Sequence, residues 1–173
     1  MPKWDKGAAF DELKEKILAL LREERQKAKR GSVIARKRLA HTIILLIQLR
    51  NGSRVGEAIE AFFKFKESKE REVRVRLEKQ RGYEERIMIL PLEVTEQDLD
   101  MASSEVTKYS VKHFARRSLG VNTHSLRYAF VTHYAQQYSP QIVAKFTGHK
   151  KLEYLLTYTQ KRKAEEILRN LPF

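Results

Sequence analysis

The sequence predicts a mainly helical α+β domain with one small antiparallel β-sheet. Over several segments, apolar residues recur at intervals of three and four, as they do on the buried face of an α-helix. Only between residues 73 and 91 does the pattern change to an alternation of polar and apolar residues, which is typical of half-buried strands. The 173 residues and 42% hydrophobic content fit a single domain covering residues 1–173, with a sizeable core.

The first three elements are expected to be helices. Residues 8–29 have their apolar side chains on one face of an amphipathic helix. Ser32 is a good N-cap for a second helix, which ends at Gly52, where glycine can adopt the left-handed conformation. Ser53 is expected to cap a third helix, so Arg54 falls in the first turn of that helix.

A β-hairpin is expected next. Residues 73–79 and 85–91 form two alternating runs rich in Val, Ile and Arg, and Gly82 between them suits a turn. Pro91 ends the second strand, because proline cannot donate a ladder hydrogen bond. The hairpin is therefore the only sheet that the sequence predicts.

Helical periodicity returns in the second half of the chain. It starts at Thr95, is interrupted near residues 101–104, and stops at Gly120. Thr123 is expected to cap the next helix, which extends to about residue 137. Pro140 then occupies the first position of a short helix, where its missing N–H costs nothing.

Composition limits the possible functions. The 35 Lys and Arg against 22 Asp and Glu give a net charge of +13, which indicates a polyanionic partner. With no cysteine, disulfides and thiolate chemistry are excluded, and no cluster of carboxylates and histidines predicts a metal site. No apolar run is long enough to span a membrane, and the first residues do not resemble a signal peptide, so a cytoplasmic location is expected.

Several side chains suited to phosphate chemistry recur along the sequence. His124 and Arg127 are three residues apart on one predicted helix and therefore share a face. The other candidates are Arg54 after the tight turn, Lys79 in the hairpin, His149 after the short helix and Tyr158 nine residues later. Tyr154, one helical turn before Tyr158, is the competing tyrosine and is interpreted as a packing residue.

These residues lie in motifs that resemble those of the tyrosine recombinases, or integrases, in order along nearly the whole chain. "NGSRVGEAIEA" resembles the first-arginine motif, with Arg54 and Glu57 in register. "HSLRY" resembles the His-x-x-Arg box, "TGHK" the Gly-His motif and "YTQ" the nucleophile segment. The residue after the second arginine is often His in the family and is Tyr128 here.

The resemblance implies an integrase-like catalytic core that cleaves and rejoins DNA through a 3′-phosphotyrosyl intermediate. Tyr158 is then the nucleophile and Lys79 protonates the departing 5′ oxygen. Two arginine forks suit the charge that develops on the phosphate oxygens, which removes the need for a metal or other cofactor. The full expected catalytic set is Arg54, Lys79, His124, Arg127, His149 and Tyr158, with the two histidines orienting groups or shuttling protons.

The resemblance also sets expectations about domains and partners. The usual N-terminal core-binding domain is not found in this sequence, and the C-terminal helix at 161–173 is expected to dock on a neighbouring subunit. The expected partner is double-stranded DNA, with a dimer or tetramer on DNA, a monomer or weak dimer when free, and association with the nucleoid. Two alternatives remain, namely relaxation of DNA in the manner of a type IB topoisomerase, and a non-catalytic DNA-binding or architectural role.

Overall fold

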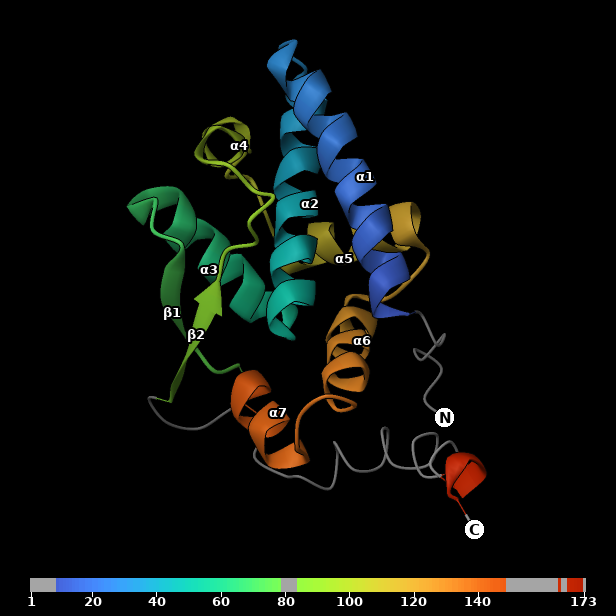
Figure 1. The fold of residues 1–173 in the computed structure, drawn as a ribbon. Helices are drawn as coiled ribbons and strands as arrows, with labels where there is room; N and C mark the ends of the chain where they lie inside the picture. The colour runs from blue at the N-terminus through green and yellow to red at the C-terminus, as the bar shows by residue number, and fades with distance from the viewer. Residues whose placement is uncertain (1–8, 79–83, 149–164, 166–167, 173) are drawn as a thin grey trace.

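The computed structural model describes residues 9–78, 84–148, 165 and 168–172. Over these residues the chain is mostly helical, with one two-stranded antiparallel sheet, so the predicted α+β class is confirmed (Figure 1). The elements are α1 (Phe10–Lys29), α2 (Val33–Asn51), α3 (Val55–Ser68), β1 (Glu72–Arg76), β2 (Glu85–Ile89), α4 (Glu96–Met101), α5 (Lys108–Leu119), α6 (Thr123–Tyr134) and α7 (Pro140–Thr147).

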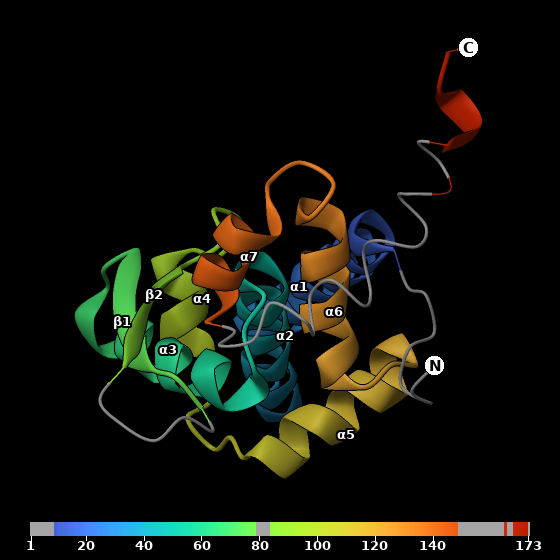
Figure 2. The same cartoon turned by 90° about the horizontal axis from the view of Figure 1, so that it is seen from below.

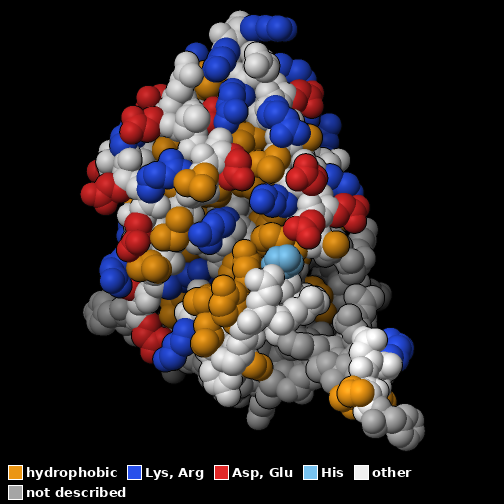
Figure 3. All heavy atoms as spheres, in the orientation of Figure 1, with side chains coloured by type: hydrophobic (Ala, Val, Ile, Leu, Met, Phe, Trp, Pro, Cys, Tyr) orange, Lys and Arg blue, Asp and Glu red, His pale blue; other side chains and the backbone are white. Residues whose placement is uncertain are grey.

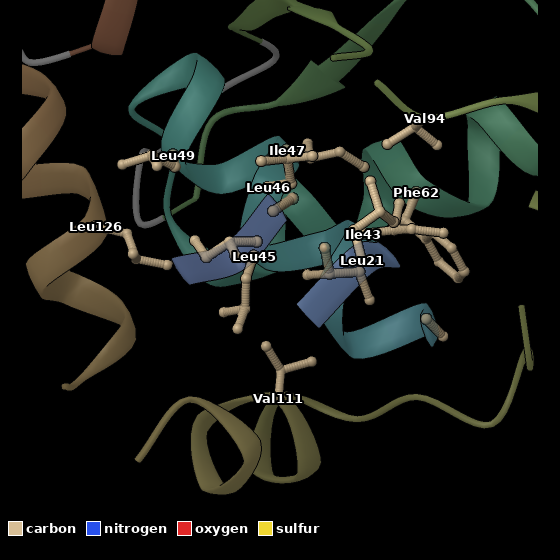
Figure 4. Close-up of a cluster of buried hydrophobic side chains, with 14 of the residues drawn as sticks. Leu21, Ile43, Leu45, Leu46, Ile47, Leu49, Phe62, Val94, Val111 and Leu126 are labelled. Carbon is tan, nitrogen blue, oxygen red and sulfur yellow. The ribbon is translucent and has the colours of Figure 1, made fainter. Parts of the chain in front are cut away.

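Helix α2 forms the centre of the molecule. Almost every side chain from Leu39 to Leu49 is buried, and a helix that is apolar on all sides needs neighbours on all sides. Figure 4 shows these neighbours, with Phe62 of α3, Val111 of α5 and Leu126 of α6 directed toward the residues of α2. The C-terminal end of α2 is consequently a fixed point around which the other elements are placed.

The hairpin is attached to that end of α2. Val73 of β1 pairs with Met88 of β2, and the core-facing side chains of both strands are covered by the helices. The side-chain amide of Asn51 donates to the carbonyl of Ile89 at 2.9 Å and accepts from its N–H at 2.8 Å. Asn51 thereby satisfies both backbone groups of Ile89, as a third strand would, and ties β2 to the last residue of α2.

Helix α5 packs against the middle of α2, where Ser110 contacts His41 (Figure 1). Helix α6 lies at the C-terminal end of α2, where Gln48 donates to the carbonyl of Thr123, and α7 adjoins α6 (Figure 2). Thr107 and Ser139 cap α5 and α7 with side-chain oxygens that accept from backbone N–H groups. Gly120 and Gly148 end the same two helices in the left-handed conformation. The expected interruption near residues 101–104, the stop at Gly120 and the start at Pro140 are all observed.

Two of the predicted N-caps are wrong by one residue. The N–H of Ser53 bonds to the carbonyl of Gln48, so Ser53 belongs to the turn that ends α2, and Arg54 is the N-cap of α3. The side chain of Asn122, not that of Thr123, caps α6 by accepting from the N–H of His124. Helix α6 also ends at Tyr134, before the expected residue 137.

The surface is strongly charged. Figure 3 shows Lys and Arg side chains spread over one face, with Asp and Glu side chains between them and apolar side chains toward the lower half. No helix in the described part of the chain is both long enough and apolar enough to cross a membrane.

Candidate active site

Arg127 is a buried charged side chain of the site. It lies on α6 with 2% of its surface exposed. Its Nη1 donates to the carbonyl of Gly52 at 2.9 Å and to that of Thr147 at 3.1 Å. One guanidinium thus links α6 to the turn between α2 and α3 and to the last residue of α7, which are distant in sequence.

Arg54 lies on that same turn. Its side chain is 22% exposed, and its Nη1 donates to the Glu57 carboxylate at 3.3 Å and to the carbonyl of Glu78 at 3.1 Å. The carboxylate of Glu57 is buried and also accepts from the backbone N–H groups of Arg54 at 3.3 Å and Glu78 at 3.0 Å. Glu57 therefore holds the arginine side chain, the start of α3 and the end of the first hairpin strand in one arrangement.

A third arginine, Arg86 of β2, was not predicted from the sequence. It is 8% exposed, donates to the carbonyl of Asn51 at 2.6 Å, and its Nη1 lies 3.7 Å from Glu57. The available signal was the strand alternation itself, because Arg86 and Met88 share the core-facing side of β2. An arginine at a core-facing position predicts a buried ion pair, and here the acidic partner is Glu57.

These charges act on one another. Burial, together with the neighbouring charge of Arg54, lowers the pKa of Arg127 to about 9, against the opposing effect of Glu57. Burial likewise lowers the pKa of Arg86 to about 10, against the opposing effect of Glu57. Both guanidinium groups stay charged at neutral pH, and an added anion would relieve their mutual repulsion. The site is therefore built to receive a negatively charged group such as a phosphodiester.

The end of β1 and the end of α7 meet at this cluster. A Cβ added to Gly148 would run into the side chain of Leu77, so the backbone at the end of α7 packs closely against the hairpin. Lys79 and His149 follow Glu78 and Gly148 in the sequence and lie outside the described residues, as does Tyr158. The structure thus places Leu77 close to Gly148, and these residues lie shortly before Lys79 and His149 in the sequence.

His124 is described and lies at the start of α6. It is one helical turn before Arg127, and it is exposed where Arg127 is buried. The two residues lie on one helix, as predicted, with His124 at the surface and Arg127 buried. Among the described residues, no group of three or more His, Asp or Glu side chains is arranged to hold a metal ion.

Comparisons with known proteins identify the class. No family model matches the chain. An uncharacterized protein of Methanocaldococcus jannaschii is 33% identical, over 97% of this chain and 88% of that protein. A protein of Acidianus two-tailed virus that is named an integrase is 43% identical over 76% of this chain, and one of the Sputnik virophage, also named an integrase, is 29% identical over 77%.

The fold agrees with these relatives. The crystal structure of the XerH site-specific recombinase bound to its difH substrate, in a pre-cleavage complex, superimposes with a TM-score of 0.64 over 92% of this chain at 19% identity. The described residues, mostly helical with one small hairpin, thus have the fold of this recombinase. The relatives named integrases and the recombinase fold together support a tyrosine recombinase, or integrase, catalytic domain.

The matched regions do not cover all of every relative. The alignment spans 56% of the Acidianus virus protein and 72% of the Sputnik protein. It spans 51% of the XerH chain. The activity, substrates and partners of those longer proteins are therefore carried to this chain only as proposals.

Proposed function

We propose that this protein cleaves and rejoins DNA strands at specific sites through a covalent 3′-phosphotyrosyl intermediate. One observation carries the proposal. Arg54 and Arg127, 73 residues apart in the sequence, are held at the same turn, and buried Glu57 fixes the first of them. Two fixed guanidinium groups at one point suit a phosphodiester, whose two non-bridging oxygens can each accept from a planar fork.

The proposed reaction is a phosphoryl transfer. The Tyr158 hydroxyl loses its proton and its oxygen bonds to the scissile phosphorus, while the bond from phosphorus to the 5′ oxygen breaks. Negative charge grows on the non-bridging oxygens in the transition state, where Arg54 and Arg127 stabilise it. The products are a 3′-phosphotyrosyl link and a free 5′ hydroxyl, and attack by a 5′ hydroxyl reverses the step and reseals a strand.

The remaining roles concern protons. Lys79 supplies the proton that the departing 5′ oxygen needs, since an alkoxide is a poor leaving group. His124 and His149 orient the phosphate or shuttle protons beside it. No metal ion enters this scheme, because the arginines supply the positive charge that a metal would otherwise provide.

The partner in this proposal is double-stranded DNA. The net charge of +13 supports it, as do the names of the viral relatives and the DNA-bound state of the XerH structure. We further propose that the protein is a monomer or weak dimer when free and works as a dimer or tetramer on DNA. The 161–173 segment would dock on a neighbouring subunit, and the bound DNA would keep the protein at the nucleoid.

The test is capture of the covalent intermediate. The protein is incubated with a nicked suicide duplex and a chelator, and the products are separated on a denaturing gel. The wild type and Tyr154→Phe should form a protein–DNA band, and Tyr158→Phe should bind DNA but form none. No band from any variant, including on DNA assembled with a partner protein, would favour the non-catalytic DNA-binding alternative. Rapid relaxation of a supercoiled plasmid without strand exchange would favour the topoisomerase alternative.

A further inference from the structure

The proposed mechanism leaves one carboxylate at the site without a role, that of Glu78. It accepts from the backbone N–H of Gly56 at 3.1 Å and from the Lys108 ammonium at 2.6 Å. The main chain of Glu78 is held as well, because its carbonyl accepts from Arg54 and its N–H donates to Glu57. This residue is therefore fixed at four points, by two helices and by both members of the Arg54–Glu57 pair.

The sequence of α3 makes room for this carboxylate. A Cβ added to Gly56 would lie 2.6 Å from Oε2 of Glu78, so any larger residue would displace it. Gly56 lies inside α3, outside the left-handed region, so its backbone does not require glycine. Glycine at this helical position costs stability relative to alanine and leaves space for the Glu78 side chain.

A carboxylate beside a phosphate site has an electrostatic cost. Burial acts to raise the pKa of Glu78, but the hydrogen bond and charge of Lys108, with smaller effects of Gly56 and Arg54, outweigh burial and lower it. Glu78 is thus charged at neutral pH and would repel a nearby phosphate. The exposed ion pair with Lys108 is by itself worth little. A role in placing the chain accounts better for a carboxylate at this position.

We infer that Glu78 is a positioning residue for strand cleavage, which fixes the end of the first hairpin strand against Arg54 and the start of α3. The residue that follows it in the sequence is Lys79, the proposed donor of the proton to the departing 5′ oxygen. This inference rests on the proposed function. It assigns Glu78 to the leaving-group side of the reaction, through the chain that carries the lysine.

Two substitutions at this position separate placement from charge. Glutamine keeps an oxygen that can accept from the Gly56 N–H, whereas alanine removes every contact of the carboxylate. If Glu78 acts by placement, Glu78→Gln should cleave within about threefold of the wild type and Glu78→Ala should be slower by about 10- to 100-fold, the effect of a small misplacement. If the carboxylate acted only by repelling DNA, both variants would cleave faster.

The leaving group locates the defect. Single-turnover cleavage is measured on two suicide duplexes, one with the normal 5′ oxygen at the scissile bond and one with sulfur in its place. A thiolate leaves without a proton, since the pKa of a thiol lies far below that of an alcohol. The Glu78→Ala rate should fall on the oxygen duplex and stay within about threefold of the wild type on the sulfur duplex.

Two further variants complete the experiment. Gly56→Ala should reproduce the Glu78→Ala pattern, because the new methyl group displaces the same carboxylate while favouring the helix. Glu72→Ala removes one exposed acidic side chain from β1, the strand that precedes Glu78, and should cleave both duplexes like the wild type. Thermal unfolding and DNA binding, measured alongside, confirm that each variant is folded.

Each result decides the inference. Slow cleavage of the oxygen duplex alone, by Glu78→Ala and Gly56→Ala, supports it. Normal cleavage by both variants, or equal slowing on both duplexes, overturns it and leaves the proposed function standing. If the wild type forms no adduct on either duplex, the proposed function fails, and the role of Glu78 fails with it.

Discussion

Replacing Arg127 with lysine should impair both folding and cleavage. A single guanidinium nitrogen, Nη1, donates to Gly52 at 2.9 Å and to Thr147 at 3.1 Å, at a position with 2% exposure. A lysine ammonium is a compact, strongly hydrated charge without a planar fork, so it cannot reproduce both carbonyl contacts and the phosphate contact together. The substitution keeps the charge and removes the geometry.

The expected size follows from these contacts. Loss of one hydrogen bond from a charged donor costs about 1.5–3 kcal/mol in the free energy of unfolding. For a chain of this length, that lowers the melting temperature by roughly 3–12 °C. Loss of a positioned donor to the transition-state oxygens lowers the cleavage rate by about 10²- to 10³-fold.

Thermal unfolding and single-turnover formation of the covalent adduct measure the two effects. Arg50→Lys is the matched control, because Arg50 is an exposed arginine in the last turn of α2. It should change neither quantity. The reasoning is refuted if Arg127→Lys melts with the wild type, or if it forms the adduct within about threefold of the wild-type rate.

Three other predictions concern the turn, the surface charge and acid stability. Gly52→Ala should lower the free energy of unfolding by about 1–2 kcal/mol because of the left-handed backbone, and by about 1–3 kcal/mol more because the new methyl group crowds Phe130. Gly120 is also left-handed but has no atom near its added Cβ, so Gly120→Ala should show only the first cost. Urea titrations measure both variants. DNA affinity should fall at least about tenfold between 50 and 200 mM salt, and an unchanged affinity in a filter-binding assay would contradict the role of the +13 charge. Burial acts to raise the pKa of Asp98, but hydrogen bonds from Arg25 and Thr95 lower it below 3.8. The ionised carboxylate therefore contributes its full share to the free energy of unfolding above about pH 4, and this share is lost as the pH falls further. Asp98→Asn should flatten that part of the curve of stability against pH.

Much of the fold could be predicted from local signals. Ser32, Thr95 and Pro140 mark helix starts, and Gly52 and Gly120 mark ends, through short-range hydrogen bonds and backbone conformations that depend on adjacent residues only. The alternation of the hairpin is equally local, and its strands form where the period changes.

The two misplaced caps show where such signals fail. Ser53 has the side chain of an N-cap, but its N–H is used to close α2, so the next helix begins one residue later. Asn122 and Thr123 are both good caps in sequence, and only the path of the chain decides between them. Competition between adjacent candidates cannot be resolved without the tertiary structure.

The site was predictable in part. Arg54 and Arg127 were predicted because they lie in ordered motifs, and their catalytic role stays a prediction, although the structure places both at the turn between α2 and α3. Arg86 and Glu78 carry no motif, and their roles arise from distant contacts with Asn51 and Gly56. In a chain with 35 Lys and Arg, charge alone does not indicate which side chains are buried together. Convergence of this kind depends on packing rather than on local sequence.

The most direct test of a tyrosine nucleophile is to identify the bond that joins protein to DNA. The adduct formed on a suicide duplex is digested with nuclease and protease, and mass spectrometry locates the residue that carries the remaining nucleotide. The proposed chemistry predicts a nucleotide joined through its 3′ phosphate to Tyr158, and a released strand whose 5′ end a polynucleotide kinase labels without prior dephosphorylation. A nucleotide on Tyr154 or on any other residue, or a released strand with a 5′ phosphate, would contradict it.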